Sequence, residues 1–193
     1  MFETLDDVLA DMAQRLEGAA TNRKCPMHMP VVVTSNVDAR TMVLRAFDGQ
    51  DWSVRFHTDM RSPKVAAIAA DPRMAVLLYD HPGKVQIRVR GRGEIISTGD
   101  IAERAWVSSD NFARRCYLGD SPGAISDRAT SGLPAEFEGI KPSDDDLVPA
   151  RQNFAALQIT LTSLDWQYLA QSGHMRAQFD RDGDIWSGRW VAP

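Results

Sequence analysis

The residues best suited to chemistry in this chain lie in its first half, and the clearest group surrounds a predicted helix start. Ser62, Pro63 and Lys64 precede an apolar run at residues 65–70. Serine is a favoured N-cap and proline fits the first helical position, so unpaired backbone N–H groups and the positive end of the helix dipole should face outward here. Lys64 adds a positive charge where acidic residues are usual. The pattern is typical of an anion site, such as one for phosphate, or of a capped surface helix with a solvated lysine.

A second polar group lies on a predicted strand. Residues 85–90 alternate between apolar and polar side chains, which is the period of a strand with one buried face. The polar face carries Gln86, Arg88 and Arg90. These donor-rich side chains either form a solvated surface or line a site for an anionic, hydrogen-bonding ligand.

Other kinds of site have no matching pattern. No Ser-His-Asp arrangement or carboxylate pair typical of acid–base catalysis is visible, and no cluster of His, Cys or carboxylate residues has metal-ligand spacing. His28, between two methionines, is expected to be structural. Cys25 and Cys116 are the only cysteines, and neither has a context typical of catalysis. We therefore assign no metal and no catalytic side chain.

The surrounding segments predict the elements that must position these groups. Residues 31–34 and 40–45 should form a hairpin through a turn at 36–39. Arg40 and Arg45 lie an odd number of residues apart, so they should point to opposite faces of a regular strand. Further strands are predicted at residues 52–58, 74–79, 85–90, 155–162, 173–179 and 184–190.

Helices and an irregular segment complete the prediction. Residues 74–79 are apolar on both faces, which predicts a strand covered on both sides. Thr4 should cap a helix that runs to about residue 20, and another helix should run from residue 97 or 98 to Trp106. Residues 119–150 are rich in Gly, Pro and Ser and contain three consecutive aspartates, so they form either a lid or arm, or a loop with solvated carboxylates.

These elements predict one domain over residues 1–193, mainly β with flanking helices. We expect a mostly antiparallel β-barrel of about six or seven strands. The chain is 44% hydrophobic, carries a net charge of −4 and has no apolar run long enough to cross a bilayer. We therefore expect no membrane and no nucleic acid as partner, with the row of arginines at 88, 90 and 92 a partial exception. Two cysteines and no basic-plus-apolar leader indicate a reducing cytoplasm.

Three motifs, in order, resemble the pyridoxamine 5'-phosphate oxidase family. Arg40-x-x-x-Leu44-Arg45 is similar to its FMN-binding Arg-x-x-x-Leu-Lys/Arg, and His57-Thr58-x-x-x-Ser62-x-Lys64 is similar to its aromatic-Thr with a following Ser-x-Lys. Gln86, followed by Gly91-x-x-Glu94, matches a flavin-contacting glutamine. The C-terminal Trp186-x-x-Arg189-Trp-Val-Ala-Pro193 resembles the family's terminal Trp-x-x-x-Arg-Leu-Ala-Pro. The resemblance covers roughly residues 31–111 and 155–193.

The resemblance implies an FMN-binding split barrel and a homodimer with FMN in two clefts between the subunits. The cofactor-binding residues that it implies are Arg40, Met42, Val43, Leu44, Arg45, His57, Thr58, Ser62, Pro63, Lys64, Gln86, Trp166 and Gln178. The substrate-binding residues that it implies are Arg45, His174 and Arg176.

Two departures from the family concern the substrate. Its Tyr-x-x-x-Arg-x-x-x-Ser pattern for the substrate phosphate is not present in register, and Arg114 and Arg115 are the nearest candidates. His174-Met-Arg176 replaces Arg-x-His, and Gln178 stands where a flavin-contacting arginine is expected.

The resemblance implies an FMN-dependent oxidoreductase that transfers a hydride from a small-molecule substrate to the flavin, with oxygen as acceptor. Such an enzyme needs no catalytic triad because the flavin carries the chemistry. Alternatives are a flavin reductase of the same fold, a non-catalytic flavin-binding or flavin-buffering protein, and a plain structural β domain.

Overall fold

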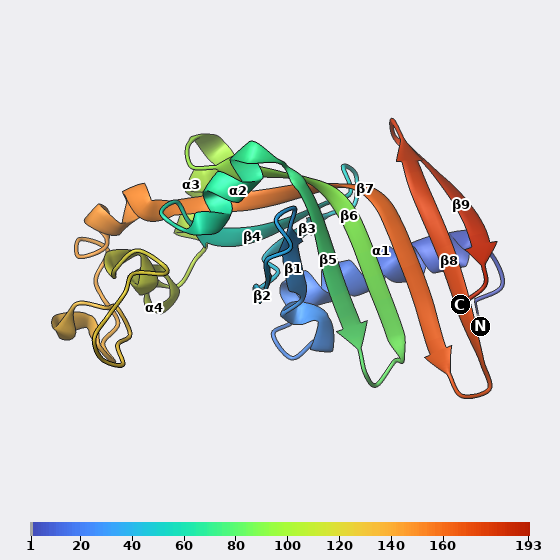
Figure 1. Cartoon of the computed structure of the whole chain (residues 1–193), viewed down its shortest axis with the longest axis horizontal. Helices are drawn as coiled ribbons and strands as arrows, with labels where there is room; N and C mark the ends of the chain where they lie inside the picture. The colour runs from blue at the N-terminus through green and yellow to red at the C-terminus, as the bar shows by residue number, and fades with distance from the viewer. Residues whose placement is uncertain (1) are drawn as a thin grey trace.

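The computed structural model describes residues 2–193, so Met1 of the predicted domain lies outside the described residues (Figure 1). Nine strands within this range pair antiparallel in one sheet, in the order β2-β1-β5-β6-β7-β4-β3, and β8 and β9 continue outward from β7. The strands are β1 Val31–Thr34, β2 Ala39–Thr41, β3 Ala46–Asp48, β4 Ser53–Asp59, β5 Arg73–Asp80, β6 Val85–Ile96, β7 Phe154–Ala170, β8 Gly173–Asp182 and β9 Ile185–Val191.

The mostly antiparallel sheet with flanking helices is confirmed, but the predicted count of six or seven strands is wrong. Of the segment expected as one strand at 40–45, only residues 40–41 are in a strand, at the end of β2, and residues 42–45 connect it to β3 on a different part of the sheet. Between them the backbone N–H of Met42 donates to the carbonyl of Pro30 at 3.1 Å, and that of Arg45 donates to the carbonyl of Arg55 at 2.8 Å. The chain therefore changes partners here, passing from the β1 side of the sheet to β4.

Strand β7 joins the two parts of the sheet. Its first half pairs with β4 and its second half with β8, while β6 lies beside nearly its whole length. The register shifts between Arg90 and Gly91, where β6 and β7 approach closely. A Cβ on Gly91 would lie 2.1 Å from the carbonyl oxygen of Thr160, so only glycine fits. The sheet bends around this point and, within residues 2–193, does not close on itself.

Helix α1 (Leu5–Thr21) lies behind β5 to β8 in Figure 1 and covers the inner face of the sheet. Its predicted start is confirmed, because Thr4 and Asp7 form a reciprocal capping box. The core between helix and sheet contains Val8, Met12, Leu16, Phe56, Ile87, Val89, Leu157, Ile159 and Trp166. The other helices are α2 Pro63–Ala70, α3 Gly99–Val107 and α4 Asn111–Arg114.

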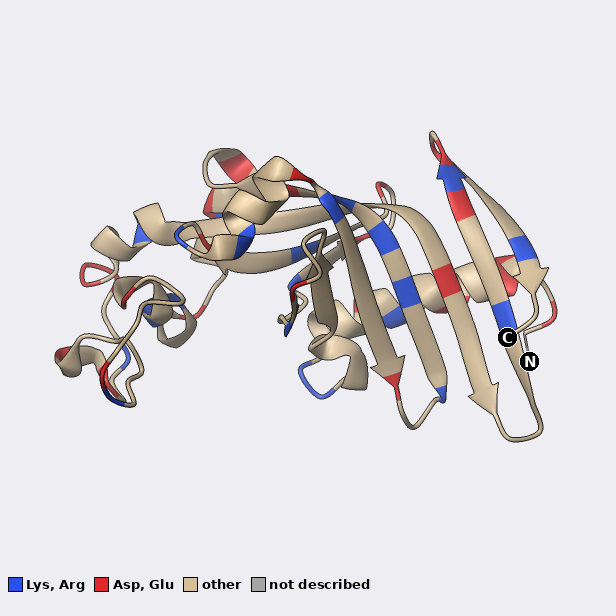
Figure 2. Cartoon of the chain, viewed as in Figure 1, with Lys and Arg blue, Asp and Glu red and all other residues tan. Residues whose placement is uncertain are grey.

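The outer face of the sheet is open in the single chain. Leu77 and Tyr79 on β5 are 36% and 43% exposed, so the prediction that this strand is covered on both sides is wrong for one chain. The alternation predicted for β6 is confirmed, with apolar residues inward and Gln86, Arg88 and Arg90 on the outer face. Figure 2 shows Lys and Arg recurring along β6.

The segment from 119 to 147 projects from the end of the molecule opposite to β8 and β9 (Figure 1). It is irregular, as predicted, apart from the short 3-10 helix η3 (Ala135–Phe137). Of the three aspartates expected to be solvated, Asp144 pairs with Arg114 at 3.2 Å and accepts from Asn111 at 3.0 Å. No helix within the described part of the chain is long and apolar enough to cross a membrane.

Candidate functional site

The predicted helix start is present and is more basic than a simple cap. Ser62 occupies the N-cap position of α2, but its hydroxyl does not cap the helix; it accepts from Lys64 Nζ at 2.7 Å. Lys64 Nζ also lies 3.4 Å from Thr58 Oγ1. Burial and the nearby Arg40 guanidinium lower the pKa of Lys64. Two cations and a helix N-terminus thus meet at one corner.

This corner opens into a cavity of about 340 Å³, which we call the basic pocket. Its lining residues are Arg40, Thr41, Met42, Val43, Arg45, His57, Thr58, Asp59, Lys64, Ser109, Ala113, Cys116, Tyr117 and Pro122. The fold therefore brings together seven of the residues implied to bind cofactor. Of the other residues in the same motifs, Leu44 is buried in the core, and Ser62 and Pro63 start α2 beside the pocket.

Arg40 and Arg45 both line the pocket, so the expectation that they point to opposite faces is wrong. The reason is the change of partner strand between them, which breaks the regular alternation. Arg45 has no carboxylate partner within residues 2–193, and its Nε is buried without a hydrogen bond. Burial lowers its pKa. The one carboxylate in the lining, Asp59, is already paired with Arg61 at 2.7 Å. The pocket is therefore set up for an anion.

His57 lies in the same pocket and is neutral at physiological pH. Burial, together with the charges of Arg45 and Arg55, lowers the pKa of His57 to about 3. Its Nδ1 lies 3.3 Å from the hydroxyl of Ser109, and its ring packs edge-on against Phe154.

Five lining residues lie in the segment after the helix predicted to end at Trp106: Ser109, Ala113, Cys116, Tyr117 and Pro122. No sequence motif in that segment predicts these residues as part of a binding site. Arg114 and Arg115, the nearest candidates for a substrate phosphate, do not line the pocket. Arg114 donates instead to the carbonyl of Val107 at 2.7 Å, and Arg115 to that of Phe137 at 3.0 Å.

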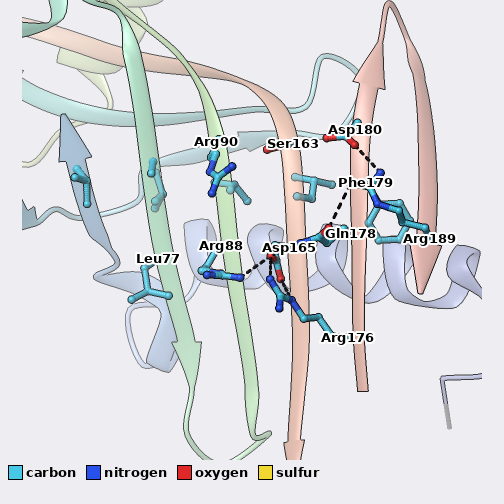
Figure 3. A pocket seen from close by; sticks show the side chains of 15 residues that line it. Leu77, Arg88, Arg90, Ser163, Asp165, Arg176, Gln178, Phe179, Asp180 and Arg189 are labelled. Atoms are coloured by element: carbon cyan, nitrogen blue, oxygen red, sulfur yellow. Dashed lines mark hydrogen bonds and ion pairs between the residues drawn. The ribbon is translucent and has the colours of Figure 1, made fainter. Parts of the chain in front are cut away.

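A second polar group lies on the outer face of the sheet, in a cavity of about 330 Å³ (Figure 3). Its centre is Asp165, whose carboxylate accepts from Arg88 at 2.6 Å, from Arg176 at 2.7 and 3.0 Å, and from Gln178 at 3.0 Å. Burial opposes the charge on Asp165, but these donors hold its pKa below the ordinary value. Arg189 extends the group by pairing with Asp180 at 2.7 Å. We call this set the outer-face network.

The single chain does not bring the outer-face network into the basic pocket, because the two cavities share no lining residue. Gln86 lies on the same strand face as Arg88 but lines neither cavity. His174 is exposed near the start of β8.

The structure does not support Trp166 as a cofactor-binding residue. It has no exposed surface, and its indole N–H donates to Asp11 on α1 at 2.9 Å. Trp166 follows Asp165 on β7, and alternation places its side chain on the core face. It therefore cannot contact a flavin directly in this arrangement.

Comparison of the chain with known proteins tests the family resemblance. The family model described as "Pyridoxamine 5'-phosphate oxidase, FMN-binding domain" matches residues 14–97. A pyridoxine/pyridoxamine 5'-phosphate oxidase from Granulibacter bethesdensis is 27% identical over 197 residues, covering 97% of this chain and 92% of that protein. The chain is thus similar to the pyridoxamine 5'-phosphate oxidase-like FMN-binding split-barrel family, and the family model covers residues 14–97. A Kineococcus radiotolerans oxidase of the same name is 47% identical, but over 79 residues, which are 41% of this chain and 34% of that one.

Solved structures agree on the split-barrel fold. A pyridoxamine 5'-phosphate oxidase-related, FMN-binding protein from Nostoc punctiforme superposes with a TM-score of 0.74 at 23% identity, covering 95% of this chain and 96% of that one. PhzG from Burkholderia lata, solved with tetrahydrophenazine-1-carboxylic acid, gives a TM-score of 0.68 at 14% identity over 96% and 92% of the two chains. The family match spans the basic-pocket motifs and Gln86 but not Trp166, His174, Arg176 or Gln178.

Proposed function

We propose that this chain is an FMN-dependent oxidoreductase that works as a homodimer. The observation that carries the proposal is the basic pocket, where Arg40, Arg45 and Lys64 face a cavity whose one carboxylate is already paired. Arg40 pairs with Asp38, but Arg45 and Lys64 form no ion pair within residues 2–193. Cations without such a partner in a half-buried site are costly unless an anionic ligand neutralises them. The residues present therefore fit a flavin phosphate.

The phosphate end is the best defined part of the proposed site. Lys64 and Arg40 supply charge, and the hydroxyls of Thr58 and Ser62 lie within reach of Lys64. The backbone N–H groups at the start of α2 point in the same direction as the helix dipole. Charge-assisted bonds of this kind bind phosphate more strongly than neutral ones.

The exposed outer face supports the homodimer. Leu77 and Tyr79 form an apolar surface beside the arginines of β6, and burying it against a second copy would remove it from water. In such a dimer the outer-face network of one subunit would complete the basic pocket of the other. Gln86, Arg88 and Gln178 would then supply hydrogen bonds to the polar edge of the flavin ring, which the basic pocket alone does not offer.

When bound, FMN would accept a hydride from a small substrate and pass the electrons to oxygen. The chain's own residues would bind and orient the FMN and the substrate. Arg45 has free hydrogen-bonding capacity beyond the phosphate corner, so it is the strongest candidate for holding an anionic substrate. Arg176 is weaker in this role because Asp165 already occupies two of its donors.

The test is the colour and the cofactor content of the purified protein. We expect a yellow protein that releases FMN on denaturation, with one FMN per chain. Colourless protein that takes up no added FMN would overturn the proposal. Oxygen consumption in the presence of candidate substrates then separates an oxidase from a flavin carrier that has no turnover.

A further inference from the structure

Two serines at the end of α3 differ in one contact. Ser108 and Ser109 both donate their hydroxyl hydrogen to the carbonyl of Ala105, at 3.2 and 2.8 Å. Only Ser109 also touches His57, with its Oγ 3.3 Å from Nδ1. Ser109 and His57 both line the basic pocket.

The hydrogen on Ser109 settles which ring nitrogen of His57 carries the proton. A hydroxyl has one hydrogen to donate, and the shorter contact, to Ala105, takes it. The Ser109 oxygen then faces Nδ1 with a lone pair, so Nδ1 must be the N–H donor. A neutral imidazole has one N–H, and His57 is neutral. Its Nε2 is therefore a bare acceptor, and it makes no hydrogen bond within residues 2–193.

An acceptor is scarce in this pocket. Arg40, Arg45 and Lys64 can only donate. The carboxylate of Asp59 accepts three hydrogen bonds from Arg61, including one from its backbone N–H. Apart from hydroxyls such as those of Thr41, Thr58 and Tyr117, which both donate and accept, His57 Nε2 is an available side-chain acceptor that can recognise a ligand's O–H or N–H.

We propose that Ser109 is a positioning residue that holds His57 as the Nδ1–H tautomer, so that Nε2 accepts a hydrogen bond from a hydroxyl or N–H group of the ligand in the basic pocket. The identity of that ligand as a flavin rests on the proposed function. FMN offers both kinds of donor, in its hydroxylated side chain and in its ring.

The tautomer is tested without any ligand, by ¹⁵N NMR of histidine-labelled protein. We expect His57 to show a protonated Nδ1 and an unprotonated Nε2 at pH 7. The Ser109→Ala variant should shift this balance toward the Nε2–H form, whereas Ser108→Ala, which removes the matching hydroxyl without touching His57, should not. A wild-type spectrum with Nε2 protonated would overturn the proposal.

Flavin titrations test the contact. His57→Phe removes the acceptor, and we expect it to weaken riboflavin about tenfold. His57→Gln places a carboxamide oxygen near the Nε2 position and should recover part of the loss. Lumiflavin keeps the ring N–H but lacks the hydroxylated chain, so an unchanged lumiflavin affinity in His57→Phe would identify a side-chain hydroxyl as the donor. Equal riboflavin affinity in wild type and His57→Phe would refute the contact. If wild type binds no flavin, the proposed function fails, while the NMR result still decides the role of Ser109.

Discussion

Lys64 Nζ donates to Ser62 Oγ at 2.7 Å, so the serine at the helix N-cap serves the lysine instead of capping the helix. The lysine is thereby held over the N-terminus of α2, where like charges would otherwise push it toward solvent. This geometry favours a bound anion over the capped surface helix that the sequence left open.

Replacing Lys64 by alanine should weaken FMN far more than riboflavin. The loss of a charge-assisted contact to phosphate costs about 1.5 to 3 kcal/mol, and riboflavin has no phosphate. Isothermal titration of both ligands measures the difference. Lys141→Ala is a matched control because Lys141 pairs with Asp110 on the surface. Equal losses for the two ligands would show that Lys64 does not serve the phosphate.

A charge on the outer face of β5 should separate the subunits and release flavin. Leu77→Glu would bury a carboxylate in the proposed interface, which is strongly unfavourable without a partner. We expect sedimentation to show a dimer for wild type and a flavin-poor monomer for the variant. Ile185→Glu, at an exposed position on β9, is the control and should stay dimeric. A flavin-loaded wild-type monomer would place the whole site within one chain.

Pyridoxine 5'-phosphate should be a poor substrate, with turnover well below the order of 1 per second common among enzymes. Arg176, implied to bind substrate, is held by Asp165 through two hydrogen bonds, and neither Arg114 nor Arg115 reaches the basic pocket. Asp165→Asn removes the competing charge and should increase turnover. The assay follows pyridoxal 5'-phosphate and peroxide in air. Fast turnover by the wild type would make this the leading activity.

His57 should make the fold less stable at mildly acidic pH. Its pKa is about 3 when folded and near 6.5 when unfolded, so between these values the unfolded chain binds the proton and the native chain does not. The contribution of His57 to the free energy of unfolding is complete above pH 6.5, and it falls by roughly 1.4 kcal/mol per pH unit below that value. His57→Phe lacks this loss, so denaturant unfolding should show its stability gaining on wild type from pH 6.5 to 4.5. If the difference in stability between the variant and wild type stays constant over this range, His57 binds the proton equally well in the folded and the unfolded chain.

The local features of this protein could be predicted from its sequence. The capping pair Thr4 and Asp7, the start of α2 at Pro63, and the alternation along β6 all depend on neighbours within a few residues. Short-range hydrogen bonds and side-chain period determine such features, so no knowledge of distant contacts is needed. The motifs that contain Arg40, His57 and Lys64 also belong to this level.

Tertiary structure decided how these pieces share a site. Because the chain changes its strand partner after β2, Arg40 and Arg45 line the same pocket, although their spacing predicts opposite faces. Ser109 reaches His57 from 52 residues away, and no spacing rule connects them. Trp166 and Asp165 are adjacent in sequence, yet Trp166 is buried against α1, whereas Asp165 binds arginines on the open face of the sheet. Alternation determines that neighbours on a strand point apart, but only packing determines what each face meets.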